Sequence, residues 1–148
     1  MPSVWGDKET QFFYALTPEK ILSSAESAGL LTTGRVLTLN SMENRVYEVE
    51  IETESSIRSD HFRVLKFYRP GRWTEAQILE EHRFLQDLVE AEIPAVAPLP
   101  LKRSATIGTM EEEGIHFAVF PRVGGRSPDE LNDSEWEQVG RLLARLHQ

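Results

Sequence analysis

Residues 64–73 read VLKFYRPGRW, and this stretch places Lys66 inside a run of strand-forming residues. The nearest acidic residues along the chain are Asp60 and Glu75. An ammonium group that is removed from water without a partner costs several kcal/mol or loses its proton. Lys66 therefore requires either an acid supplied by another segment or an open pocket that holds an anion.

The bulk composition excludes several classes of protein. The 148 residues carry a net charge of −8 with a pI near 5.0, whereas a nucleic-acid surface needs a basic patch. There is no cysteine for a disulfide or a thiolate metal site, and no apolar run of about 18 residues for a membrane span. The first residues lack a secretory pattern. We expect a cytoplasmic protein of one domain or lobe with neither nucleic-acid nor membrane partners.

The first half of the chain predicts a helix, three strands and a second helix. Thr17 as N-cap and Pro18 at the first helical position open the first helix, and Gly29 is a plausible stop. Apolar and alternating patterns predict strands over 36–39, 46–51 and 61–68. Thr74 and Gln77 form a capping box at the start of a long helix that ends before Pro94.

The second half predicts a hairpin and a last helix. Residues 95–104 are interrupted by proline and predict at best a short strand from Leu99. Residues 107–120 predict a hairpin that turns at 112–114, with a central second strand. A linker follows, and a capping box from Ser134 to Glu137 opens a helix that runs to the end of the chain. Hairpins with packed helices indicate an α+β fold with an antiparallel sheet of about five strands.

The long helix offers an acid for Lys66. With Ile78 set at 0° and about 100° per residue, Glu81 falls at roughly 300°, inside the apolar stripe. Glu80 falls at roughly 200°, outside that stripe. Lys66 and Glu81 are therefore a candidate buried ion pair. The alternative is that Lys66 extends to solvent at a sheet edge and Glu81 merely borders the stripe.

A lysine in a strand and a glutamate on the next helix form the characteristic ion pair of protein-kinase-like folds. Four segments, LNSMENRVYEV, VLKFYRPGRWTEAQILEEHRFLQDLVEAEIPAVAP, HFAVFPRVGGR and GRLLARLHQ, resemble the bacterial stress response kinase A family. These are serine/threonine protein kinases of the aminoglycoside-phosphotransferase branch of that fold. The resemblance covers residues 13–148 and implies an ATP-binding lobe over 1–120, a hinge and linker over 121–133, and the first helix of a second lobe over 134–148.

The resemblance implies roles at the phosphate end of an ATP site. Lys66 would bind the α- and β-phosphates of ATP, and Glu81 would hold Lys66. Ser41 and Asn44 fall in the phosphate loop, which here contains no glycine, so Ser41 would offer its hydroxyl and backbone N–H groups. Val64 would cover the adenine. The alternative for residues 41–44 is an ordinary hairpin turn.

The resemblance also places the hinge that binds the adenine edge at residues 120–123. Pro121 has a carbonyl but no N–H, so it can only accept, and Val123 would supply the donor two residues later. Without the resemblance, Phe120-Pro121 is simply a strand end.

The resemblance further implies ATP and Mg²⁺ as cofactors and a protein hydroxyl as acceptor. The family's catalytic loop and metal ligands follow later in sequence, and no H-x-D-x-x-x-x-N motif occurs in these 148 residues. We therefore expect the chain alone to be inactive, and its last helix to be exposed or to mediate self-association. The alternatives are a lobe of a homoserine, choline or aminoglycoside kinase, or a non-catalytic interaction module.

Overall fold

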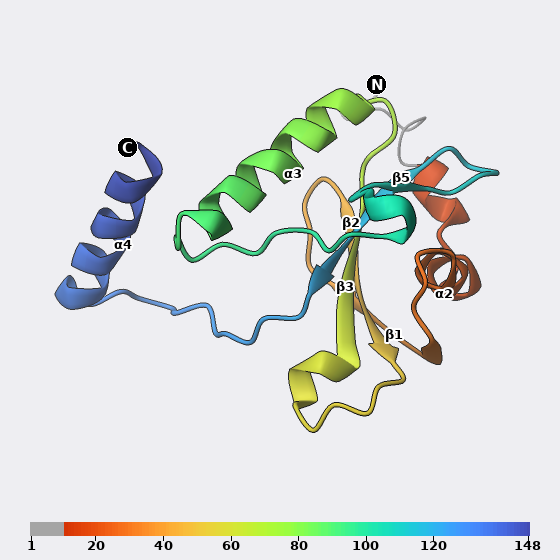
Figure 1. Ribbon diagram of the computed structural model, residues 1–148, viewed down its shortest axis with the longest axis horizontal. Coiled ribbons are helices and arrows are strands. Elements are labelled where there is room, and N and C mark those ends of the chain that lie inside the picture. Colours follow the sequence, from red (N-terminus) through yellow and green to blue (C-terminus); the bar gives the residue numbers. More distant parts are fainter. Residues whose placement is uncertain (1–10) are drawn as a thin grey trace, which may run out of the picture.

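The computed structural model describes residues 11–148 and has an α+β architecture built on one antiparallel sheet (Figure 1). The five strands lie in the order β1-β2-β3-β5-β4. The elements are a 3-10 turn Gln11–Ala15, α2 Pro18–Ser27, β1 Thr32–Leu39, β2 Arg45–Ile51, a 3-10 turn Arg58–His61, β3 Phe62–Phe67, α3 Glu75–Glu90, a 3-10 turn Lys102–Ser104, β4 Gly108–Thr109, β5 His116–Pro121 and α4 Asp133–Leu146. This confirms the predicted fold class.

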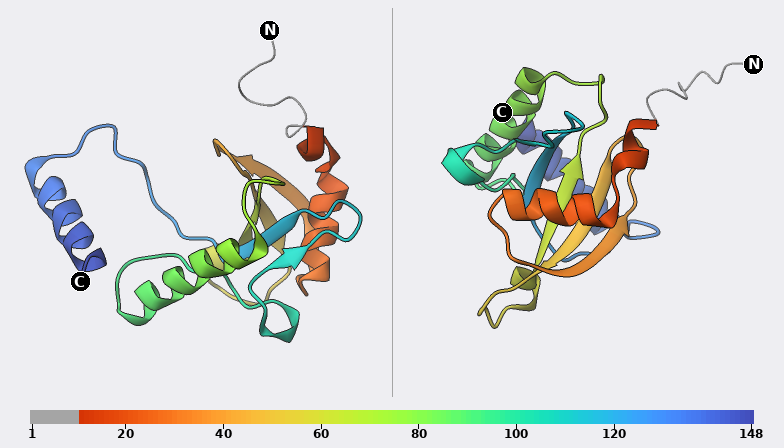
Figure 2. Two further views of the ribbon diagram at one scale, coloured as in Figure 1. Left: turned by 90° about the horizontal axis from the view of Figure 1, so that it is seen from above. Right: turned by 90° about the vertical axis from the view of Figure 1, so that its right-hand side faces the viewer.

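Two helices cover opposite faces of the sheet (Figure 2). Leu65 and Phe67 of β3 pack with Ile21 of α2 in the larger core cluster. Because side chains alternate along a strand, Val64 and Lys66 point to the other face, where Ile78 of α3 packs. The alternation therefore places Lys66 on the same side of the sheet as the long helix.

The predicted helix starts at Thr17 and Thr74 are confirmed. Each threonine hydroxyl accepts from the backbone N–H three residues later, and Thr74 with Gln77 forms a complete capping box. The start of the last helix was predicted wrongly at Ser134. Asn132 is the N-cap and forms a capping box with Glu135, so the helix begins at Asp133 and Ser134 lies within its first turn.

Two strand predictions need correction. β1 begins at Thr32 rather than Val36, with a register irregularity between them and Gly34 at φ 95°. Such a bulge breaks the alternation from which a strand is recognised. No strand begins at Leu99, although its N–H donates to Val119 of β5 at 2.7 Å. The hairpin turn at 112–114 is confirmed, since the Gly114 N–H donates to the Met110 carbonyl.

Helix α4 stands apart from the sheet, at the end of an extended segment that leaves β5 (Figure 1). A hydrogen bond from Arg145 Nη2 to the Glu92 carbonyl connects it to the rest of the molecule. Trp136 and Leu143 are 60% and 51% exposed. Self-association through this apolar face stays a prediction. Among the described residues, no helix is long and apolar enough to cross a membrane.

Candidate functional site

The central contact of the site is the ion pair between β3 and α3. Lys66 Nζ lies 2.7 Å from Glu81 Oε1, so the predicted pairing is present. The prediction that it is buried was wrong, because the two side chains are 23% and 44% exposed. Ile78 and His82 take the buried positions of α3, and Glu81 lies at the margin of that stripe. The pair is therefore open to a ligand.

A cleft of about 390 Å³ opens beside this pair. Its lining residues are Val64, Lys66, Glu81, Leu85, Val96, Phe120, Pro121 and Val123. The structure thus brings together five of the seven site residues predicted from sequence. One end of this set is charged and the rest is apolar, which suits a ligand with a flat apolar part and an anionic tail.

The strand register explains why the cleft forms there. Lys66 lies opposite Ala118 of β5, and Val64 lies opposite Phe120. Pro121 is the last residue of β5, so the chain leaves the sheet next to Val64. Residues distant in sequence are therefore assembled by the β3–β5 pairing.

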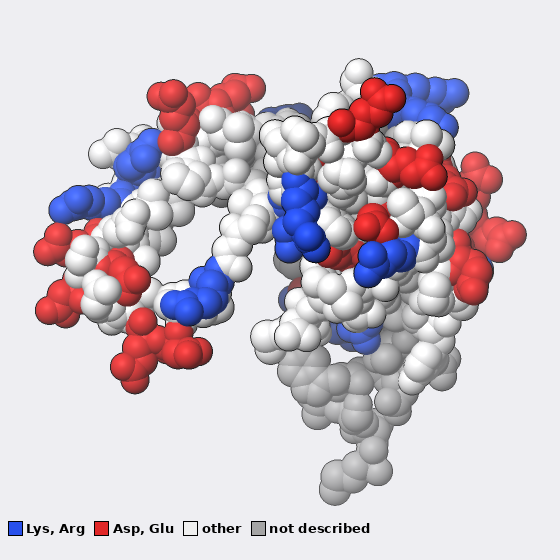
Figure 3. Space-filling model, turned by 90° about the horizontal axis from the view of Figure 1, so that it is seen from below, with Lys and Arg blue, Asp and Glu red and all other residues white. Residues whose placement is uncertain are grey.

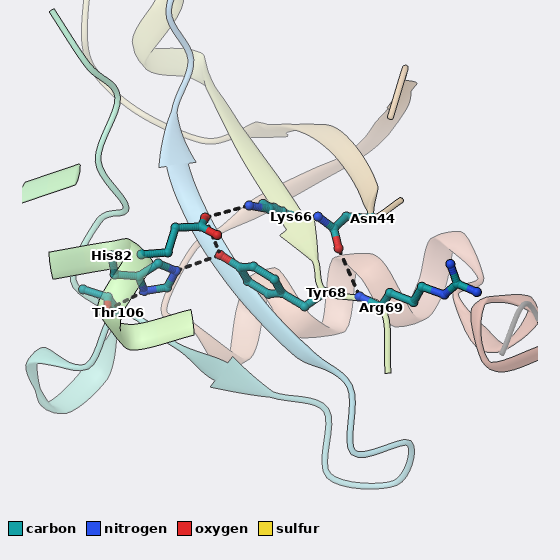
Figure 4. A network of polar contacts seen from close by, with 7 residues as sticks. Asn44, Lys66, Tyr68, Arg69, His82 and Thr106 are labelled. Atoms are coloured by element: carbon teal, nitrogen blue, oxygen red, sulfur yellow. Dashed lines mark hydrogen bonds and ion pairs between the residues drawn. The ribbon is translucent and has the colours of Figure 1, made fainter. Parts of the chain in front are cut away.

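Ser41 and Asn44 do not line the cleft. Ser41 is exposed in the turn between β1 and β2. The side-chain oxygen of Asn44 accepts a hydrogen bond from the backbone N–H of Arg69 at 3.1 Å (Figure 4). Asn44 therefore ties this turn to the segment that follows β3, which is a structural contact that the sequence did not predict.

A chain of buried polar groups lies behind the ion pair (Figure 4). The Tyr68 hydroxyl lies 2.8 Å from His82 Nε2 and 3.4 Å from Glu81 Oε1. His82 Nδ1 lies 2.8 Å from Thr106 Oγ1. Burial lowers the pKa of His82, and burial together with the Glu81 charge raises the pKa of Tyr68. Sequence reasoning missed this set, although His82 lies one helical turn after Ile78 on the buried face.

The predicted hinge segment is anchored to the sheet. Arg122 Nε donates to Glu48 Oε2 of β2 at 3.1 Å, and its guanidinium lies 5.5 Å from the ring centroid of Phe62. These contacts hold the backbone between Pro121 and Val123. Sequence reasoning missed Arg122, because its partners are defined only by the pairing of β2 with β3.

A larger cavity of about 590 Å³ lies between α2 and the β4–β5 hairpin. Its Lys20 is ion-paired with Glu113 and lies 3.8 Å from Glu112. Glu111 and Lys102 also line this cavity, so three glutamates face two lysines and the net charge is negative, which disfavours a polyphosphate. We therefore locate the candidate site in the smaller cleft. On the face drawn in Figure 3, basic side chains are interspersed with acidic ones.

No group of three His, Asp or Glu side chains within residues 11–148 is arranged to hold a metal ion. The described residues therefore do not fit a Mg²⁺ site by themselves.

The antiparallel sheet, its packed long helix and the lysine–glutamate pair at a cleft are the features of a protein-kinase-like fold. The chain belongs to the Phosphotransferase enzyme family (APH), whose model matches residues 36–148. It is 40% identical over 136 residues to Serine/threonine protein kinase RdoA of Salmonella typhimurium and to Stress response kinase A of Escherichia coli K12. The alignment covers 92% of this chain and 39% of each relative, so the chain spans about two fifths of their length. The resemblance noted from sequence is confirmed.

Solved structures share the fold. The amicoumacin kinase hAmiN, in complex with AMP-PNP, Ca²⁺ and Ami, superposes with a TM-score of 0.72 at 22% identity, covering 96% of this chain and 42% of that one. A microcompartment-associated aminopropanol kinase superposes with a TM-score of 0.63 at 22% identity, covering 86% of this chain and 39% of that one.

Proposed function

We propose that this chain is the ATP-binding lobe of a serine/threonine protein kinase of the stress-response type. The observation that carries the proposal is the cleft in which the Lys66–Glu81 pair and the 120–123 segment face a common space. In this proposal residues 1–120 form the lobe, 121–133 the hinge and linker, and 134–148 a helix that belongs to the second lobe. The 40% identity to the stress response kinases supports the same reading.

Each lining residue has a role in this proposal. The Lys66 ammonium binds the α- and β-phosphates, while the Glu81 carboxylate keeps the ammonium in place 2.7 Å away. Val64 packs against the adenine from β3. The Pro121 carbonyl accepts from the adenine amino group, and the Val123 N–H donates to the ring nitrogen. Ser41, in the turn between β1 and β2, would contribute polar groups to the outer phosphates.

In the same proposal, Mg²⁺ and the catalytic base are held by the part of the relatives that this chain does not span. The 148-residue chain should therefore bind ATP but transfer no phosphate. Purified chain incubated with radiolabelled ATP and a generic protein acceptor should give no labelled product above background. A clear ATP-dependent rate would contradict this assignment of the catalytic groups.

The binding role is tested at the hinge. Val123→Pro removes the backbone N–H that the adenine requires, whereas Val123→Ala keeps it. Calorimetric titration should show ATP binding to the wild type and to Val123→Ala, and at least about tenfold weaker binding to Val123→Pro, because a ring nitrogen then loses its only donor. Equal affinities in the two variants would contradict the proposed hinge contact, and no binding to the wild type would contradict the proposed function.

A small-alcohol acceptor is the second candidate, and the fold neighbours that are named as aminopropanol and amicoumacin kinases favour it. They are 22% identical to this chain, whereas the relatives named as stress response kinases are 40% identical. The full-length protein should therefore label a protein acceptor and leave amino alcohols unlabelled. The opposite result would favour the small-molecule reading, and absence of transfer to either would favour a non-catalytic module.

A further inference from the structure

The ion pair at the cleft is backed by a histidine that the proposed ATP chemistry does not use. His82 is 1% exposed, yet both of its ring nitrogens have a partner at 2.8 Å, namely Tyr68 and Thr106. Tyr68 contacts both members of the ion pair. Its hydroxyl lies 3.4 Å from Glu81 Oε1, and its ring centroid lies 4.6 Å from Lys66 Nζ.

Counting hydrogens leaves two possible directions for this chain of hydrogen bonds. The Tyr68 hydroxyl has one hydrogen, which it can donate either to Glu81 or to His82 Nε2. If Tyr68 donates to Glu81, then His82 Nε2–H donates to the Tyr68 oxygen and Thr106 donates to His82 Nδ1. If Tyr68 donates to His82, its oxygen lone pairs face the Glu81 carboxylate, and Glu81 loses a donor.

The charge on Glu81 selects between the two directions. An ionised carboxylate can only accept, and hydrogen bonds to charged groups are stronger than those between neutral groups. The contact from Tyr68 to Glu81 is longer, at 3.4 Å, than the 2.8 Å contact to His82, so distance by itself favours donation to His82 and the charge of the carboxylate is what favours donation to Glu81. Burial lowers the pKa of His82 and so favours the neutral ring, in which Nδ1 can accept from Thr106 when Nε2 carries the hydrogen.

We propose that Tyr68 and His82 are positioning residues for the nucleotide phosphates. The directed chain from Thr106 through His82 to Tyr68 orients the Glu81 carboxylate, and the Tyr68 ring supports the ammonium of Lys66 from a second side. The inference rests on the proposed function, because it concerns how the ATP-binding lysine is held. It adds a role for three residues behind the cleft that do not touch the nucleotide.

The first test compares ATP with adenosine. Tyr68→Phe keeps the ring and removes the hydroxyl, so the affinity for ATP should fall by about fivefold, since the lost hydrogen bond is stretched but charge-assisted. The affinity for adenosine should stay within about twofold, because adenosine lacks the phosphates that Lys66 binds. Equal losses for the two ligands would mean a general structural effect and would overturn the proposal.

A matched pair of threonine variants keeps the test independent of Tyr68. Thr106→Val removes the donor to His82 and should selectively weaken ATP binding in the same direction. Thr109→Val removes a similar contact, in which Thr109 Oγ1 lies 2.9 Å from His116 Nδ1 away from the cleft, and should leave ATP affinity unchanged. The proposal is overturned if both variants change the ratio of ATP affinity to adenosine affinity, or if neither does. In either case the hydrogen-bond chain from Thr106 through His82 to Tyr68 does not position Lys66.

The second test needs neither a variant nor a nucleotide. Nitrogen-15 NMR of the wild-type chain should show His82 protonated on Nε2 and unprotonated on Nδ1. The opposite tautomer would direct the Tyr68 hydrogen away from Glu81 and would overturn the proposal. The tautomer can be determined even if the chain fails to bind ATP. The direction of the hydrogen-bond chain is therefore tested separately from the proposed ATP-binding function.

Discussion

Replacing Lys66 with methionine isolates the electrostatic part of the proposed phosphate site. The substitution keeps the apolar stem and removes the charge, while the Glu81 carboxylate stays at the cleft. Lys66 in the wild type attracts the phosphates and Glu81 repels them from further away. In Lys66→Met only the repulsion is left, so affinity for ATP should fall, and adding Glu81→Gln should recover part of the loss.

The magnitude follows from the geometry of the pair. A phosphate in contact with Lys66 lies about 4 Å from the ammonium and about 7 Å from a carboxylate placed behind it. A phosphate bound in this cleft would remain open to solvent, so the effective dielectric between it and the two side chains lies between that of a surface pair and that of water. At an intermediate dielectric of about 40, the lost attraction is about 2 kcal/mol and the remaining repulsion about 1 kcal/mol. These energies correspond to a loss of about thirtyfold in Lys66→Met and a recovery of about fivefold in the double variant.

The assay is competition of unlabelled ATP against a fluorescent ATP analogue on the 148-residue chain, without Mg²⁺, so that the nucleotide keeps its full charge. Lys20→Met is the matched control, because Lys20 is also ion-paired with glutamate but lines the cavity beside α2. Thermal unfolding should change little in Lys66→Met, since a solvent-exposed ion pair contributes at most about 1 kcal/mol. Single and double variants of equal affinity, or a Lys20→Met loss as large as that of Lys66→Met, would refute the reasoning.

Three further predictions concern the surrounding structure. Gly108→Ala should destabilise the chain by about 1–3 kcal/mol in chemical denaturation, because a Cβ there would lie 2.4 Å from the Phe117 ring; an unchanged midpoint would contradict the packing. The His82 pKa is lowered from 6.5, so below about pH 6.5 the unfolded chain binds a proton that the folded chain does not. Stability should therefore decrease as pH falls below that value, and a slope as steep in His82→Gln as in the wild type would contradict this. Asn44→Ala should cost about 1 kcal/mol and Ser41→Ala almost nothing, since only Asn44 has a structural bond; equal losses would refute that difference.

Local sequence signals predicted where the long helix begins and which of its faces points to the sheet. The capping box at Thr74 and the helical period predicted that Glu81 faces the sheet, and the apolar pattern over residues 61–68 predicted that Lys66 lies in a strand. Both rules act within one element and need no knowledge of strand pairing. This is why the ion pair could be predicted from sequence.

Three other features could not be predicted, because two sequence signals overlap or because the contacting residues are distant in sequence. The capping-box pattern predicted a helix start at Ser134 with Glu137, whereas the helix uses the overlapping pair Asn132 and Glu135. The burial of the Lys66–Glu81 pair was overestimated. The helical period gives the angle at which Glu81 leaves the helix, but it does not say how much of that side chain the neighbouring elements cover. The bond from Asn44 to Arg69 joins residues that come together only after β2 and β3 have paired.

Mapping the residues that bind ATP is the most direct test of the central claim. Backbone NMR spectra of the chain, assigned and recorded during a titration with ATP, report the site residue by residue. We predict that the largest shifts occur at Val64, Lys66 and Val123, around the cleft beside α3. Shifts confined to Lys20 and the β4–β5 hairpin would place the nucleotide in the other cavity and contradict the account.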